Sequence, residues 1–154
     1  METFLNYYAY STALRPAGAQ SAGQRHDYQR AEWGLHRYAL QVAGGLELGP
    51  EAVYCEVDSG ANVYIALDQR LPGLPGYDAA LLWNSRCGWA LGIEYSDSSE
   101  VLMLSYLGTV LLPDPSAVVL FAKSALAGQP AGQLLPPQPH CPDLTGRLAE
   151  YSEP

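Results

Sequence analysis

The chain has 154 residues and a formal net charge of −8, with eight Lys and Arg against sixteen Asp and Glu. Nucleic acids and anionic membrane surfaces are bound through clustered cations, so this charge balance argues against both as partners. Hydrophobic residues make up 48% of the chain, which is enough to build the core of one domain. The composition therefore predicts a single small acidic domain.

The cysteines and the first residues indicate the compartment. Cys55, Cys87 and Cys141 are odd in number and widely spaced, which is a poor disulfide framework. The N-terminus lacks the basic and then apolar pattern of a signal peptide, and no stretch reaches the roughly 18 apolar residues of a membrane helix. We expect a cytoplasmic protein with reduced thiols.

Residues 1–27 are predicted to form a flexible N-terminal segment. Its start is rich in aromatic residues, and residues 15–24 have the Ala, Gly, Gln and Ser composition of a linker. The aromatic residues of this start are Phe4, Tyr7, Tyr8 and Tyr10.

A helix is predicted from Tyr28, with Asp27 as its N-cap and Gly49-Pro50 after its end. Apolar residues there recur at steps of three and four, which places them on one helix face. These residues are Ala31, Leu35, Tyr38, Ala39, Val42 and Leu46.

Five short strands are predicted next, separated by turns that favour an antiparallel meander. Their ranges are Ala52–Asp58, Asn62–Asp68, Ala79–Trp83, Trp89–Tyr95 and Val101–Leu107. The continuous apolar run Ala79–Trp83 is typical of a strand buried on both faces. In the first two strands, alternation assigns one face to a core, and its residues are Val53, Cys55, Val57, Val63, Ile65 and Leu67.

A second helix is predicted after the sheet, with Asp114 as N-cap, Pro115 at the first helical position and Gly128 at its end. The Pro-rich residues 129–154 are expected to be extended or disordered, with room for a short helical turn near Leu148. The fold class is therefore α+β. We predict one domain over residues 28–128, with a sheet of about five strands and two helices packed on one face.

No motif points to catalysis, a metal or a cofactor. The histidines and cysteines have no zinc-ligand spacing, and the chain has neither a G-x-S-x-G nor a phosphate-binding loop. Arg86 beside Cys87 would favour the thiolate, although a cysteine in a turn is more often inert. We expect no catalytic residue, no metal ligand and no cofactor.

The choice of aromatic residues is the strongest anomaly, with eleven Tyr and three Trp but two Phe. Tyr and Trp suit half-wet surfaces such as protein interfaces. Alternation places an aromatic and acidic group on the sheet face away from the helices, made of Tyr54, Glu56, Asp58, Tyr64 and Glu94. We predict that this group binds a partner with basic residues, a second copy of the chain or a flat ligand.

Two other functions stay open. A small-molecule pocket could lie beside the loop from Leu71 to Tyr77 and be lined by Trp83 and Trp89. An enzyme could use the carboxylates Glu56, Asp58 and Glu94 in acid–base chemistry. The leading hypothesis is a non-enzymatic interaction or regulatory module.

Six segments between residues 34 and 125 resemble a family of small actinobacterial proteins of unknown function that is common in streptomycetes. The segments are Gly34–Tyr38, Leu48–Asp58, Tyr64–Gly73, Ala80–Asn84, Gly88–Glu94 and Tyr106–Gly108. The resemblance implies an actinobacterial origin and supports the domain limits, and it implies no activity, cofactor or site residue.

Overall fold

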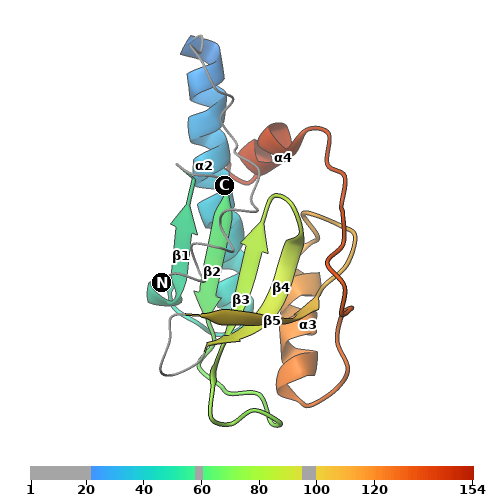
Figure 1. Ribbon diagram of the computed structural model, residues 1–154. Helices are drawn as coiled ribbons and strands as arrows, with labels where there is room; N and C mark the ends of the chain where they lie inside the picture. Colours follow the sequence, from blue (N-terminus) through green and yellow to red (C-terminus); the bar gives the residue numbers. More distant parts are fainter. Residues whose placement is uncertain (1–21, 58–60, 95–99) are drawn as a thin grey trace.

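A computed structural model of the chain describes residues 22–57, 61–94 and 100–154, which form an antiparallel sheet with helices packed on one face (Figure 1). The described elements are α2 (Ala22–Gly45), a 3-10 turn (Pro50–Ala52), β1 (Val53–Glu56), β2 (Asn62–Ala66), β3 (Asp78–Asn84), β4 (Gly88–Glu94), β5 (Val101–Tyr106), α3 (Pro115–Leu126) and α4 (Leu144–Glu150). The predicted α+β class is confirmed, and α4 is a helix beyond the two that were predicted.

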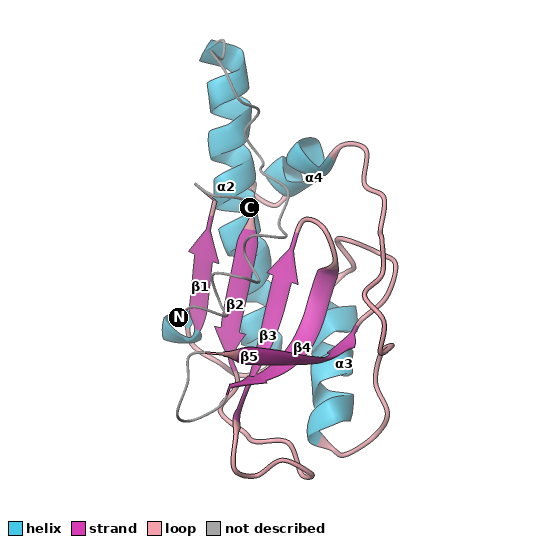
Figure 2. Ribbon diagram, viewed as in Figure 1, coloured by secondary structure: helices cyan, strands magenta, loops and turns pink. Residues whose placement is uncertain are grey.

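The five strands lie in sequence order, each antiparallel to the next. The predicted meander is therefore confirmed. The register of β4 and β5 shifts at Leu91/Gly92, which is an irregularity of the β-bulge type. Beyond this point β5 crosses in front of the other strands (Figures 1 and 2).

Gly92 is required where β5 approaches the sheet. A Cβ on Gly92 would lie 2.8 Å from Cγ1 of Val101 and 3.1 Å from the carbonyl oxygen of Leu102. Any other residue would push β5 away, which is a common reason for glycine inside a strand.

Helix α2 presents the predicted apolar face to the sheet. Ala31, Leu35, Tyr38, Ala39 and Val42 are fully buried. The described part of the helix already includes Ala22, so the predicted cap Asp27 lies inside the helix. Ala22, Gln24 and Arg25 are good helix formers that support this additional turn. The aromatic residues 4–10 lie outside the described part of the chain.

The core lies between α2, α3 and one face of the sheet. The six predicted core residues of β1, β2 and their flanks all belong to this cluster or pack against it. Helix α3 begins as predicted, because the Asp114 carboxylate accepts a hydrogen bond from the Ser116 amide at 2.9 Å and Pro115 takes the first turn.

Residues 144–150 form α4, where an extended or disordered tail with room for a short helical turn near Leu148 was expected. Leu148 is fully buried, and a Cβ on Gly34 of α2 would collide with the carbonyl oxygen of Leu148, so the two backbones meet at this glycine. Helix α4 has seven residues, too few for apolar periodicity to stand out in the sequence. None of the described helices is long and apolar enough to span a membrane.

Candidate functional site

The sheet face opposite α2 and α3, here called the far face, carries the aromatic and acidic residues. Strand alternation and the register place Tyr54, Tyr64, Leu82 and Ala90 on this face. Tyr54 of β1 pairs in register with Tyr64 of β2, so the two side chains are cross-strand neighbours. The side chain of Tyr54 is 53% exposed. The predicted aromatic surface therefore exists on this face.

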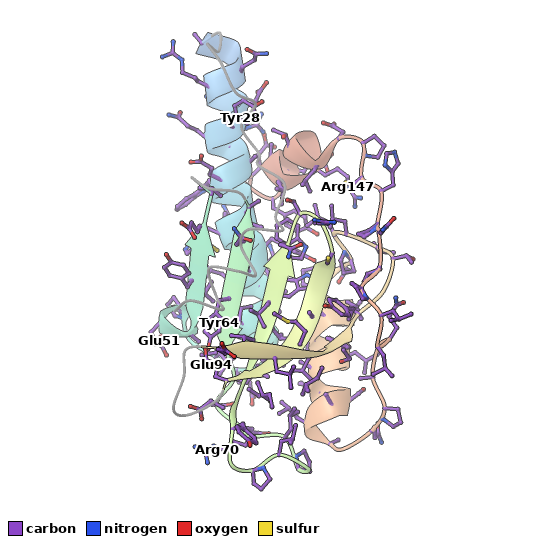
Figure 3. All side chains as sticks on the ribbon, viewed as in Figure 1. Tyr28, Glu51, Tyr64, Arg70, Glu94 and Arg147 are labelled. Carbon is purple, nitrogen blue, oxygen red and sulfur yellow. The ribbon has the colours of Figure 1, made fainter. Side chains whose placement is uncertain are left out.

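A hydrogen bond joins Tyr64 to the acidic part of the far face. The Tyr64 hydroxyl donates to Oε1 of Glu94 at 2.7 Å, and the two side chains meet beside the start of β5 (Figure 3). Burial, the hydrogen bond to Glu94 and the charges of Glu94 and Asp78 all raise the pKa of Tyr64. The hydroxyl therefore stays protonated at neutral pH and holds the Glu94 carboxylate in one position.

A second, smaller apolar cluster lies on the far face, where β5 crosses the sheet (Figure 1). Its buried members are Ala80, Leu82 and Val101, with Tyr64 and Met103 packed against them. Tyr64 therefore combines a packing role with its hydrogen bond, whereas Tyr54 is exposed beside it.

Four of the five predicted partner-binding residues lie on the far face, and Asp58 lies outside the described residues. Glu56 pairs in register with Asn62 at one end of the sheet, whereas Glu94 pairs with Asp78 at the other. Six residues of β4 separate these ends, which is roughly 20 Å of strand. The carboxylate enzyme considered above would need Glu56 and Glu94 together, and the register separates them.

Two far-face residues were not predicted as part of the site. Asp78 shares the alternation of Leu82 and adds a carboxylate next to Glu94, with Arg70 paired to it at 3.3 Å. Asn62 is fully buried, and within the described residues neither its amide nitrogen nor its amide oxygen has a hydrogen-bond partner. The alternation that selected Tyr64 also places Asn62 on this face, whereas Asp78 lies one residue before the predicted strand Ala79–Trp83.

The structure places the two tryptophans of the alternative small-molecule site inside the core. The indole N–H of Trp83 donates to the carbonyl of Leu111 at 2.8 Å, and that of Trp89 donates to the hydroxyl of Tyr38 at 3.0 Å. Both side chains are at most 1% exposed. Leu71 is also buried and Tyr77 packs against the core, so these four side chains serve the fold.

A surface hollow of about 300 Å³ lies at the turn between β3 and β4. It contains Cys87, and burial raises the pKa of that thiol by more than the neighbouring Arg86 lowers it. The expected activation of Cys87 by Arg86 is therefore outweighed, and the thiol stays protonated. The lining consists of Asn84, Arg86, Cys87, Tyr106, Pro136, Pro137 and Gln138.

Metal chemistry has no support in the described part of the chain. No group of three His, Cys, Asp or Glu side chains in residues 22–57, 61–94 and 100–154 is placed to hold a metal ion. The arrangement on the far face offers carboxylates, a fixed tyrosine hydroxyl and an exposed aromatic ring, which are groups that bind cations and amides.

Comparison with known proteins gives a family and no activity. Comparison with curated proteins found no match, and comparison with solved structures found none either. A family model described as "Family of unknown function (DUF6292)" matches residues 38–124, which agrees with the span of the resemblance seen in the sequence. This match covers β1–β5, most of α3 and the last third of α2, and we conclude that the chain belongs to the DUF6292 family of unknown function.

Proposed function

We propose that this chain is a non-enzymatic protein-interaction module whose far face binds a basic segment of a partner protein. One observation carries the proposal. Tyr54 and Tyr64 are cross-strand neighbours, and the Tyr64 hydroxyl donates a hydrogen bond to Glu94. Aromatic rings and carboxylates thus form one continuous track across the sheet.

An arginine or lysine side chain suits this track. A cation can stack on the exposed ring of Tyr54, a contact worth about 0.5–1 kcal/mol at exposed sites. An adjacent cation of the same segment can pair with Glu94 or with its register neighbour Asp78. The net charge of −8 adds long-range attraction for a basic partner and speeds its association.

The fixed geometry of Glu94 strengthens the case for binding. Because Tyr64 packs on Ala80 and Leu82 while its hydroxyl holds the carboxylate, Glu94 is positioned before a partner arrives. Such preorganisation lowers the entropy cost of binding. A carboxylate kept only for solubility would gain nothing from this support.

Native mass spectrometry of the protein purified gently from its own host tests the proposal. We expect a second polypeptide with the wild-type protein, and its loss with Tyr54→Ala and with Glu94→Gln, which removes the charge that Tyr64 positions. Leu120→Ala is the matched control, because Leu120 is 67% exposed on α3 and away from the far face. Binding of the recovered partner should weaken as salt is raised.

Three results would contradict the proposal. The complex could survive both far-face variants, or it could be lost with Leu120→Ala instead. A bare wild-type monomer would also count against it. A small excess mass on the wild-type protein would favour a small-molecule site in place of a protein partner.

A further inference from the structure

The segment Leu134–Pro139, here called the proline strap, has the sequence Leu-Leu-Pro-Pro-Gln-Pro and is not used by the far face. Leu134 is 83% exposed and Leu135 is 77% exposed, the two highest values among the large hydrophobic side chains of the described part. Two adjacent leucines in water are unfavourable, because burying their apolar surface would lower the free energy. The strap therefore presents an apolar surface that calls for an explanation.

The residues of the strap dictate its backbone conformation. Pro136, Pro137 and Pro139 have φ confined near −65°, and a residue that precedes proline is confined to extended ψ values. Leu135, Pro136 and Gln138 all precede a proline. These restrictions favour the polyproline II region at most positions of the run, and the structure contains no helix or strand over residues 136–140.

Both ends of the strap are tied to the domain. On one side, Gln133 exchanges two backbone hydrogen bonds with Tyr106 of β5, at 2.7 and 2.8 Å. On the other side, the chain enters α4, whose Leu148 is fully buried against α2. A Pro-rich tail would be free at one end, whereas this strap is held on both sides and has little conformational entropy left to lose on binding.

The exposure pattern shows which edge of the strap faces outward. A polyproline II helix has three residues per turn, so it presents three edges. Pro137 is buried, whereas Leu135, Pro136 and Gln138 are exposed and Pro139 is half-buried. Pro137 therefore rests on the domain, and the two Xaa-Pro pairs on either side of it, Leu135-Pro136 and Gln138-Pro139, keep exposed or half-buried surface.

We propose that the proline strap is a docking site for a partner domain with an aromatic-lined groove that recognises polyproline II helices. Such grooves accept Pro-x-x-Pro segments, and Pro136 and Pro139 have this spacing. The exposed Leu135 supplies an additional apolar contact next to the first proline of the pair. This site is separate from the far face and does not depend on the function proposed for it.

The test uses the full chain and three purified probe domains, one each of the SH3, WW and EVH1 classes, followed by NMR of the labelled probe. We expect wild-type protein to shift the aromatic groove resonances of at least one probe. The double variant Pro136→Ala/Pro139→Ala should bind that probe at least about tenfold more weakly, as expected for loss of central contacts. Pro130→Ala, at an exposed proline before the strap, should bind as wild type does.

Leu135→Ser provides a second variant at a position with no role in the core, so weaker binding cannot be ascribed to unfolding. Thermal unfolding of each variant checks that the fold is kept. The proposal is overturned if no probe binds the wild-type chain, or if binding survives both the double variant and Leu135→Ser.

Discussion

The two faces of the sheet differ in which side chains are buried and in whether their polar groups have hydrogen-bond partners. On the helix-covered face, Trp83 and Trp89 are buried and both indole N–H groups have acceptors. On the far face, Tyr54 is exposed and the buried amide of Asn62 has no partner among the described residues. The helix-covered face thus obeys the rules of a folding core, whereas the far face keeps polar groups that a core would not retain. This difference is why we place function on the far face.

Trp83→Ala should have the largest effect. Loss of this fully buried side chain is expected to lower the free energy of unfolding by about 3–5 kcal/mol, measured by urea denaturation. Its strand neighbour Leu82 points to the far face, where the cluster is small, so Leu82→Ala should cost about 2 kcal/mol. Equal losses of unfolding free energy in the two variants would contradict the difference between the two faces.

Gly92→Ala should destabilise the protein by about 1–3 kcal/mol, because the added Cβ would press on Val101 and on the backbone of Leu102. The matched control is Gly44→Ala, where a Cβ meets nothing within 4 Å in the last turn of α2. That control should stabilise the protein by roughly 0.5–1 kcal/mol. If both variants unfold at the same urea concentration, β5 does not press on the sheet as described.

Alkaline pH should weaken the helix-covered face through Cys55. Burial raises the pKa of this thiol from 9.0 to about 12, so between these values the folded state binds more protons than the unfolded state. Its contribution to stability is complete below pH 9 and is lost as pH rises toward 12, with a slope of at most about 1.4 kcal/mol per pH unit. Urea denaturation across this range should show a shallower decline for Cys55→Ala, and an unchanged slope would show that the thiol is not desolvated.

Asn62→Leu should stabilise the protein by about 1 kcal/mol, since it removes a buried amide that lacks partners and keeps a similar volume. The measurement is the urea midpoint of the variant against that of the wild type. A loss of stability would mean that the Asn62 amide has hydrogen-bond partners in solution. The buried polar groups of the far face would then be satisfied, as they are in the core.

The smallest effect on stability is expected from Tyr54→Ala, which should stay within about 0.5 kcal/mol of wild type because the ring is exposed. The same variant should have the largest effect on partner binding. A loss of more than about 2 kcal/mol would show that Tyr54 belongs to a core, and the far face would lose its exposed aromatic anchor.

Local signals were sufficient for most of the fold. Alternation, apolar runs and turn residues located all five strands. The run Ala79–Trp83 was correctly assigned to a strand buried on both faces because it lacks polar positions. The start of α3 followed from Asp114 and Pro115, since a cap acts within one turn. The sequence indicated only a short helical turn near Leu148, because the seven residues of α4 depend on contact with Gly34, more than a hundred residues earlier in the chain.

Predicting the candidate site required both the local alternation of the sequence and the tertiary structure. Alternation assigned Tyr54, Tyr64 and Glu94 to one face, and this needs only the period of a strand. The hydrogen bond from Tyr64 to Glu94, and the separation of Glu56 from Glu94, depend on strand register and on the folding of β5 over the sheet. The sequence by itself determined which side chains share a face, because that is a local property of the backbone. Tertiary structure alone decided which of them touch and which are covered, because register, twist and burial are set by contacts between residues far apart in the chain.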